Sequence, residues 1–321
     1  MVLSRGKRTM HGPSRLLVLL AVPFVLAACG DDPEPVVEVP SWAKVAPEQV
    51  AEAKKHGVPV AFENDLGMRF VLIPAGTFLM GSPEDEEGRD DDETQHDVTI
   101  TKPFYMQTTE VTNEQFRRWR SMHDSGEHGG HSLNAAQQPV VMVAWDDAHA
   151  FAAWLSERDA FRRYRLPTEA MWERACRAGS ITRYVWGNDD AVGWRHANGM
   201  DEETTKVLGE PIFPWEGDDG HRVAAPVGRY PPNPWGVHDM HGNVWEWCAD
   251  EYGPYPGVLV VDPTGPSGDG EQRVQRGGSW FSAPKWARSA ARDWYMPDKG
   301  HDCYGFRLVS PLPEPKQDAT E

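Results

Sequence analysis

Residues Arg165–Gly179 read RLPTEAMWERACRAG and carry the clearest structural signals in this 321-residue chain. The proline ends an extended segment, and Thr168 is a typical helix N-cap because its hydroxyl can accept a hydrogen bond from a free backbone N–H. Gly179 is a typical helix stop because glycine readily adopts the left-handed conformation found there. The stretch therefore predicts a strand, a sharp turn and a short helix. Glu169 and Glu173, four residues apart, would share one face of that helix.

Two more helices are expected upstream of this stretch. Thr112 and Gln115 fit a capping box, in which the side chains at a helix start satisfy free backbone N–H groups. After Trp145, apolar residues recur at the spacing of one helical face. These residues are Ala148, Phe151, Ala152 and Leu155. Both segments predict helices that bury one side.

Short strands and loops make up the rest of the expected domain. The segment Phe70–Ser82 contains two apolar runs separated by Pro-Ala-Gly, which predicts a hairpin. The acidic run at residues 83–95 predicts a solvated loop. Beyond residue 180 no helical period is sustained. We therefore expect one domain over residues 62–311, followed by a polar tail at residues 312–321.

The composition narrows the classes of partner and of fold. The formal net charge is −17, which argues against a nucleic-acid partner because a phosphate backbone would be repelled. The chain contains 14 tryptophans, 30 glycines and 27 prolines. This mixture favours a loop-rich fold held by buried aromatic rings over one built from long helices.

The N-terminal residues resemble a bacterial lipoprotein signal. Basic residues precede the apolar run Leu16–Leu26, which is too short for a transmembrane helix. The sequence LAAC at Leu26–Cys29 then implies removal of residues 1–28 and acylation of Cys29, for example with palmitate. The protein would then be anchored by lipid to a membrane, on the exported side, in the bacterial cell envelope. An ordinary secretory signal with an incidental cysteine is the alternative. Residues 29–61 are expected to form a tether, because they are rich in proline and acids up to about Pro47. A short helix is expected within this segment, at Glu48–Lys55.

Three cysteines remain for the mature domain. They are Cys176, Cys248 and Cys303. An exported protein can form disulfides, and an odd number of cysteines leaves one thiol unpaired. The residues alone allow any of three pairs.

Seven segments occur in an order that resembles the formylglycine-generating enzyme (sulfatase-modifying factor) family. They are IPAGTFLMGS, EVTNEQF, PVVMVAWDDAHAFAAWL, RLPTEAMWERACRAG, PVGRYPPNPWGVHDMHGNVWEW, RVQRGGSW and GFRLV. The resemblance implies a compact single α+β domain, a variant of the C-type-lectin fold. It also implies a disulfide between Cys176 and Cys303, with Cys248 left as a buried thiol or exchanged into that pair.

The copper chemistry of this family is not expected here. Its oxidases convert a substrate cysteine to formylglycine with two cysteines that bind copper(I) just after a Gly-Gly-Ser turn, and copper(I) prefers sulfur ligands. The corresponding segment Trp280–Ala291 contains no cysteine. Ser282 and Ala287 take the two positions when the segments are matched from the turn, while Ser279 matches the family's active-site serine. No residue is therefore assigned a catalytic role with confidence.

The resemblance implies two structural calcium sites. One would use the side chains of Asn198 and Asp219 and the backbone carbonyls of Gly199 and His221. The other would use the side chains of Asp239 and Glu246 and the backbone carbonyls of Gly242 and Val244. Calcium binds such mixtures of carboxylate, amide and carbonyl oxygens. A buried carboxylate such as Glu246 must in any case be paired or bound to a cation.

The expected function is binding of a peptide or cell-envelope component through the former active-site cleft. Aromatic residues after the turn are the candidates for its lining. They are Trp280, Phe281, Trp286 and Trp294. A structural lipoprotein within an envelope complex is one alternative.

An active oxidase of the same family, either formylglycine-generating or dependent on non-haem iron, is another alternative. Iron would need clustered histidines and carboxylates, which the sequence alone does not assemble. The histidines His123, His128 and His131 occur in a polar, glycine-rich loop. A flexible loop seldom holds a preformed metal site, so these histidines are not expected to bind one.

Replacing Cys29 tests the predicted anchor. In cells fed an alkyne-bearing fatty acid, the unchanged chain should be labelled and sediment with membranes, whereas Cys29→Ser should be unlabelled and soluble because the acyl chains supply the membrane affinity. Cys248→Ser is the matched control and should behave like the unchanged chain. Continued labelling of Cys29→Ser would contradict the assignment.

Overall fold

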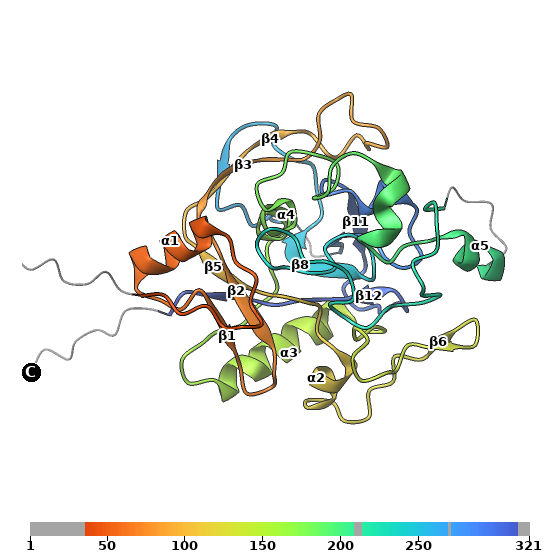
Figure 1. The fold of residues 1–321 in the computed structure, drawn as a ribbon, viewed down its shortest axis with the longest axis horizontal. Coiled ribbons are helices and arrows are strands. Elements are labelled where there is room, and N and C mark those ends of the chain that lie inside the picture. The colour runs from red at the N-terminus through yellow and green to blue at the C-terminus, as the bar shows by residue number, and fades with distance from the viewer. Residues whose placement is uncertain (1–35, 209–213, 269–270, 314–321) are drawn as a thin grey trace, which may run out of the picture. The chain divides into compact units, whose positions relative to one another are not determined.

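The computed structural model describes residues 36–208, 214–268 and 271–313 (Figure 1). The expected signal at residues 1–28 and the acylated Cys29 lie outside the described residues, as does most of the expected tail. Within the described ranges, no helix combines the length and the apolar character needed to cross a bilayer.

Short elements follow one another along the chain. The helices are α1 (Pro47–His56), α2 (Asn113–Arg117), α3 (Trp145–Arg158), α4 (Glu169–Arg177) and α5 (Glu202–Leu208), with 3₁₀ helices η1 (Asp190–Arg195) and η2 (Pro284–Ala287). The strands are β1 (Ala61–Glu63), β2 (Arg69–Ile73), β3 (Gly76–Met80), β4 (His96–Ile100), β5 (Phe104–Gln107), β6 (Glu127–His128), β7 (His131–Ser132), β8 (Trp245–Glu251), β9 (Val260–Val261), β10 (Arg273–Arg276), β11 (Arg292–Tyr295), β12 (Tyr304–Gly305) and β13 (Val309–Pro311).

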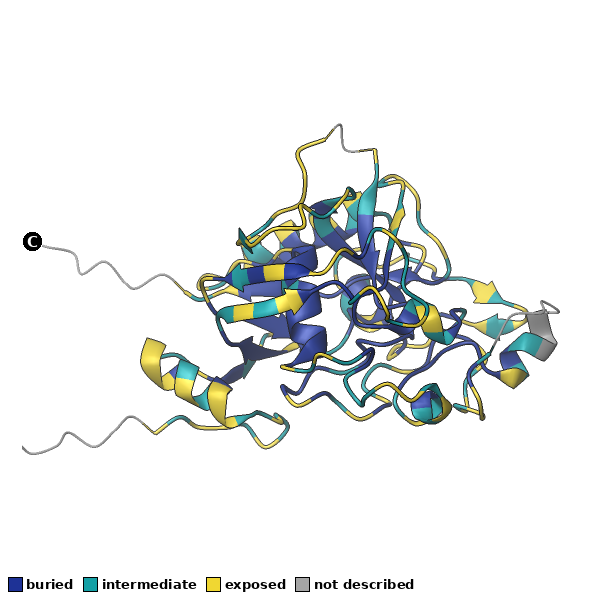
Figure 2. Cartoon of the chain, turned by 90° about the horizontal axis from the view of Figure 1, so that it is seen from above, coloured by how far each residue is buried: buried dark blue, intermediate teal, exposed yellow. Residues whose placement is uncertain are grey.

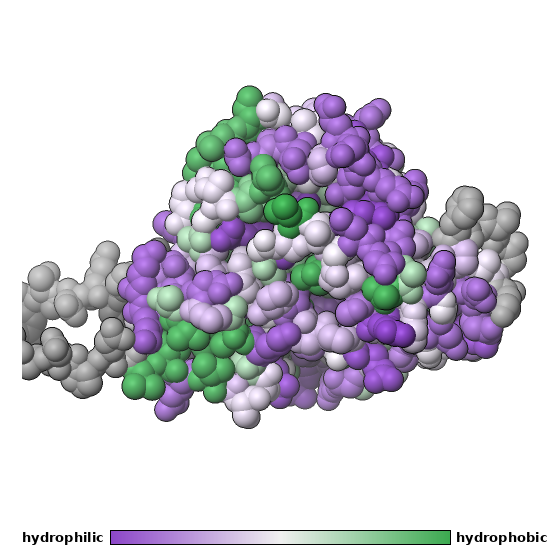
Figure 3. Space-filling view, turned by 45° about the horizontal axis from the view of Figure 1, so that its top comes forward, coloured by the Kyte–Doolittle hydropathy of each residue, from purple (hydrophilic) through white to green (hydrophobic). Residues whose placement is uncertain are grey.

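The strands form several small sheets around α4. Their orders are β1-β2-β5-β13, β11-β10-β8-β12, β3-β4-β9 and β6-β7. Helix α4 contacts β3, β8 and β10 and lies near the centre of the domain (Figure 1). Buried residues gather in this central region (Figure 2), while the face in Figure 3 is largely hydrophilic with separate apolar areas. The expected mixture of short helices and strands is therefore present.

Local capping explains why α4 begins and ends where it does. The Thr168 hydroxyl accepts a hydrogen bond from the Met171 backbone N–H at 3.2 Å, as its N-cap position predicts. The Asp250 carboxylate accepts a second bond from the Glu169 N–H at 2.9 Å. At the other end Ala178 adopts the left-handed conformation with φ 44°, one residue before the predicted stop at Gly179.

Four buried charges join α4 to the sheet that precedes the Gly-Gly-Ser turn. Arg276 on β10 donates to Glu169 at 3.0 Å and to Glu173 at 2.5 Å. Arg292 on β11 donates to both oxygens of Glu169, at 2.7 and 3.0 Å. No side chain of the four is more than 5% exposed. The two glutamates predicted to share a helical face therefore serve as the anchor for two strands.

The predicted hairpin at Phe70–Ser82 is wrong. Strand β2 pairs with β1 and β5, whereas β3 pairs with β4 in another sheet. The Arg174 guanidinium donates to the carbonyl oxygens of Pro74 and Ala75, at 2.7 and 2.8 Å. These bonds hold the connecting turn against α4, so the chain passes between sheets instead of folding back.

The domain begins before residue 62, contrary to the expected tether over residues 29–61. Helix α1 and strand β1 belong to the folded part. The fully buried Gln49 side chain donates to the carbonyl oxygens of Leu72 and Trp235, at 2.7 and 3.1 Å. Ala53 is buried on the same helix. Helix α1 agrees with the short helix expected at Glu48–Lys55, whereas its contacts place it in the domain and not in a tether.

The acidic run at residues 83–95 is only partly a solvated loop. Glu93 is fully buried and accepts hydrogen bonds from the Arg288 guanidinium with both carboxylate oxygens. Glu86 also binds Arg288, at 2.6 Å. The run therefore covers the segment that follows the Gly-Gly-Ser turn.

Removing one charge of the α4 network should destabilise the domain strongly. Glu173→Gln removes one of the negative charges that balance the buried Arg276 guanidinium. The free energy of unfolding should therefore fall by about 3–5 kcal/mol. The matched variant Glu63→Gln disrupts an exposed pair with Arg69 and should cost less than about 1 kcal/mol. Urea denaturation measures both. Similar losses in the two variants would contradict the anchoring role.

Candidate functional site

The Gly-Gly-Ser turn directly follows β10. Gly277 and Gly278 have φ values of 101° and 75°, which favour glycine. A Cβ on Gly278 would lie 3.0 Å from the Trp286 carbonyl oxygen, so the turn packs closely against η2. The hydroxyl oxygens of Ser279 and Ser282 lie 3.1 Å apart, and the Ser282 hydroxyl accepts a bond from the Ser279 N–H at 3.0 Å. The two serines thus serve as hydrogen-bond partners for one another.

Ala287 takes the second position at which the family's oxidases have a cysteine, and its side chain has no metal-binding atom. Its methyl group is buried, and its carbonyl oxygen lies 2.7 Å from the Nδ1 atom of His241. Burial lowers the pKa of His241 to about 4, which keeps the ring neutral near pH 7. The Ser282 carbonyl oxygen accepts a bond from the indole of Trp215 at 3.2 Å. The two positions are therefore packed into the structure.

One thiol does reach the turn, which the sequence did not reveal. The Ser279 side chain is near enough to the Cys303 thiol to lower the pKa of that thiol, against the larger effect of burial. Its carbonyl oxygen accepts a bond from the Trp245 N–H at 2.9 Å, where β12 begins to pair with β8. Cys303 is only 6% exposed, and burial raises the pKa of its thiol.

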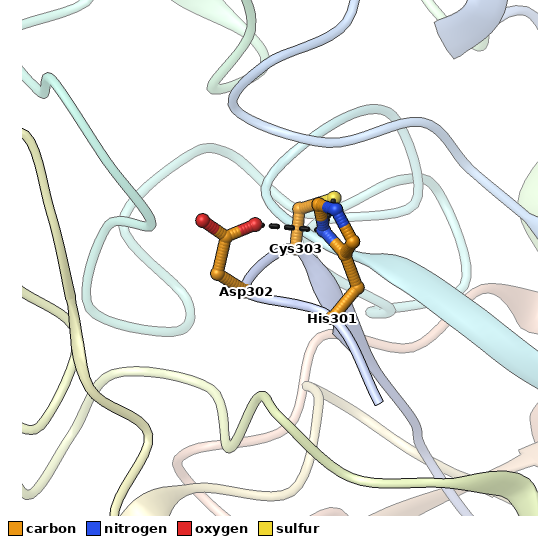
Figure 4. A group of neighbouring side chains, drawn as sticks. All are labelled: His301, Asp302 and Cys303. Atoms are coloured by element: carbon orange, nitrogen blue, oxygen red, sulfur yellow. Dashed lines mark hydrogen bonds and ion pairs between the residues drawn. The ribbon is translucent and has the colours of Figure 1, made fainter. Parts of the chain in front are cut away.

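A histidine–aspartate cluster accompanies that thiol (Figure 4). The Nδ1 atom of His301 lies 2.7 Å from an Asp302 oxygen and 3.2 Å from the Cys303 sulfur. The other Asp302 oxygen lies 2.6 Å from Nδ1 of His128. Hydrogen bonding to His301 is the largest cause of a lowered Asp302 pKa. His128, which was expected to lie in a flexible loop, is held on β6 of a short hairpin.

The expected disulfide between Cys176 and Cys303 is absent from the structure. All three described cysteines are free and buried. The Cys176 sulfur faces the Met240 carbonyl oxygen at 3.7 Å and Nε2 of His241 at 3.6 Å. Cys303 instead faces His301 and Ser279. The two sulfurs have different neighbours because α4 and the segment before β12 direct them into different surroundings.

The four expected cleft aromatics have different surroundings. Trp280 is 1% exposed and packs against His128 and Phe281, with ring centroids 5.0 and 5.5 Å away. Trp286 packs against Trp245, with ring centroids 6.5 Å apart. Trp294, 36% exposed, lies 6.0 Å from the ring of Tyr252. Phe281 is thus the half-buried aromatic beside the histidine–aspartate cluster.

The first expected calcium set surrounds Asp219. Its carboxylate accepts bonds from the backbone N–H groups of Gly199 and His221, at 3.0 and 2.8 Å. These residues were expected to contribute carbonyl oxygens, whereas the observed bonds come from their N–H groups. The side-chain oxygen of Asn198 is buried and has no hydrogen-bond partner among the described residues. This oxygen is therefore available as a ligand for a cation.

Two acids that the sequence did not single out join this set. Carboxylate oxygens of Asp201, Asp218 and Asp219 lie within 4.8 Å of one another. Burial raises the pKa of Asp219 to about 7, which means that its ionised form lacks sufficient compensation. A hard divalent cation favours such oxygen donors and would offset the clustered charge. The set therefore fits calcium, and Asp201 and Asp218 extend it.

One of the two side chains of the second expected set is already engaged. Both oxygens of Glu246 accept bonds from the buried Arg307 guanidinium, at 2.6 and 2.7 Å, and Trp172 donates to one of them at 2.9 Å. Glu246 is therefore paired with an arginine from the GFRLV segment. Of the two predicted side chains, Asp239 has the oxygen without a partner. Burial, followed by the charge of Asp239, raises the pKa of the nearby Glu110.

The backbone residues of the second set have a structural role. Val244 is fully buried. Gly242 has φ 89°, and a Cβ there would lie 2.1 Å from the Asn198 carbonyl oxygen. That carbonyl oxygen accepts a bond from the Asn243 N–H at 2.7 Å. The two expected sets are therefore in direct contact.

Comparisons with known proteins agree with this fold. Residues 55–312 match the sulfatase-modifying factor enzyme 1-like domain. A formylglycine-generating enzyme from Streptomyces coelicolor is 31% identical over 299 residues, covering 75% of this chain and 88% of the relative. The inactive C-alpha-formylglycine-generating enzyme 2 of Mus musculus is also 31% identical, over 303 residues, covering 77% and 87%. Overall identity therefore does not distinguish an active from an inactive relative.

Solved structures give the same result. PvdO from Pseudomonas aeruginosa has 32% sequence identity and a TM-score of 0.68, covering 78% of this chain and 98% of PvdO. CarF has 23% identity and a TM-score of 0.56, and this likeness concerns the fold alone. The expected family and α+β class are thereby confirmed. The lectin-type variant stays a prediction.

Calcium removal tests the Asp219 set. At calcium 100 times its dissociation constant, binding adds about 2.7 kcal/mol of stability, which corresponds to a melting temperature higher by roughly 5–10 °C. A chelator should remove this increment from the unchanged chain, and Asp219→Asn should show little response. Asp91→Asn, at a fully exposed position, is the control and should respond normally. A chelator-independent melting temperature would contradict the assignment.

Proposed function

The chain belongs to the sulfatase-modifying factor enzyme 1-like family, and from this premise we propose that it is a membrane-anchored, exported member that binds a ligand. The ligand is a peptide or a cell-envelope component, bound at the position where the family's oxidases hold copper. Formylglycine generation with copper is not part of this function.

The observation that carries the proposal is the pairing of Ser279 with Ser282. Copper(I) needs soft sulfur ligands, and two hydroxyls that bond to one another at 3.1 Å are hard donors already engaged. Ala287, at the second position, has no donor atom. Cys303 supplies one sulfur beside Ser279, which is one fewer than the pair used by the oxidases.

Accessible groups beside the serines support ligand binding. Phe281 is half-buried, and the His301 and His128 side chains are 48% and 32% exposed. An aromatic surface next to polar groups is typical of sites that bind peptides or small ligands. The anchor part of the proposal rests on the lipoprotein-like sequence that ends at Cys29.

An activity assay tests the absence of copper chemistry. The purified chain, supplied with copper(I), oxygen and a cysteine-containing peptide, should leave the peptide unchanged in mass because it lacks the second thiolate. The Streptomyces coelicolor relative serves as the positive control. Multiple turnovers to the aldehyde by this chain would contradict the proposal.

Peptide selection tests the binding surface. A random peptide library should yield enriched sequences on the unchanged chain and lose that enrichment on Phe281→Ala, because the aromatic contact is removed. Phe161→Ala, which removes a 76% exposed ring elsewhere, is the matched control and should retain enrichment. No enrichment, or equal loss in both variants, would argue against a peptide ligand at this surface.

A further inference from the structure

We propose that His301, Asp302 and Cys303 bind a divalent transition metal of the zinc class beside Ser279. Their donor atoms, an imidazole Nδ1, a carboxylate oxygen and a sulfur, lie within 4.8 Å of one another. Figure 4 shows the Asp302 carboxylate and the Cys303 sulfur both close to the His301 imidazole. Zinc prefers this combination of nitrogen, sulfur and oxygen ligands.

The distances are close to those that a metal requires. His301 Nδ1 lies 2.7 Å from the Asp302 oxygen and 3.2 Å from the Cys303 sulfur. With typical zinc bond lengths, tetrahedral geometry separates such donors by roughly 3.3–3.6 Å. The two separations would therefore have to increase by about 0.4–0.6 Å to admit the ion.

The backbone holds the three residues in place. The His301 carbonyl oxygen accepts bonds from the N–H groups of Met142 at 2.8 Å and Tyr304 at 3.2 Å. The Cys303 carbonyl oxygen accepts the Trp245 N–H at 2.9 Å. Because β12 is fixed on β8, consecutive residues present donors from an ordered turn. A preformed arrangement lowers the cost of organising a metal site.

Protonation also favours a metal at this position. Nδ1 of His301 has two close neighbours but can carry only one hydrogen, so a single N–H cannot serve both Asp302 and Cys303. A metal takes the place of the protons of the imidazole nitrogen and the thiol. All three donors are then satisfied at once.

His128 completes the arrangement from outside. Its Nδ1 lies 2.6 Å from the second oxygen of Asp302, which leaves the first oxygen for the metal. Hydrogen bonds of this kind orient metal ligands. Three protein ligands leave a fourth position open on zinc, and the His301 side chain is 48% exposed. A ligand with a carboxylate or thiolate could bind there, a consequence that rests on the proposed function, whereas metal binding itself does not.

Cobalt and zinc titrations test the site in the purified full-length protein, stripped of transition metals and kept in calcium. One equivalent of Zn²⁺ should bind by calorimetry. Co²⁺ should give a thiolate-to-metal charge-transfer absorption that disappears in Cys303→Ser and persists in Cys248→Ser. His128→Ala should weaken Zn²⁺ binding by about 10–100-fold, and His301→Ala by more, while His131→Ala, on the same hairpin, should not change it.

Each variant is first checked for an unchanged unfolding transition. The inference is overturned if neither ion binds at 100-fold molar excess, if the cobalt absorption survives in Cys303→Ser, or if His131→Ala weakens binding as much as His301→Ala. These readouts involve neither peptide binding nor formylglycine. A failure of the metal site is therefore distinguishable from a failure of the proposed function.

Discussion

Two buried glutamates on α4 hold the strands on which the candidate site depends. Glu169 and Glu173 bind Arg276 and Arg292, which lie on β10 and β11. Arg276 directly precedes the Gly-Gly-Ser turn, so the positions of Ser279 and Ser282 follow from this contact. Buried ion pairs of this kind need not exceed an apolar core in stability, but they admit few alternative arrangements. In a domain with short strands and helices, that selectivity fixes how the loops are placed.

Local signals explain what the sequence predicted about the fold. The caps at Thr112 and Thr168 are confirmed because a hydroxyl and the N–H groups it serves lie within one helical turn. The hairpin at Phe70–Ser82 was wrong because the turn is held by Arg174, about 100 residues away. The partner of Glu246 could not be read for the same reason, since Arg307 lies 61 residues further along the chain.

The candidate site, like the fold, could be predicted from the sequence only in part. That this segment lacks the two copper-binding cysteines follows from the sequence alone, since no cysteine occurs in Trp280–Ala291. The contact of His128 with Asp302 joins residues 174 positions apart, and no local pattern announces it. The residues His301, Asp302 and Cys303 are consecutive in the sequence, but the sequence alone did not identify them as a metal site. Their convergence depends on a turn fixed by β12 and β8.

The free thiols have a consequence for the conditions under which this domain can fold. A disulfide between α4 and the C-terminal strands would have made the fold sensitive to the redox potential of its compartment. The structure instead joins α4 to the later strands through carboxylate–guanidinium contacts, while Cys176, Cys248 and Cys303 are free. Carboxylate–guanidinium contacts form without a change of oxidation state, so this connection between α4 and the strands β10 and β11 consumes no oxidant.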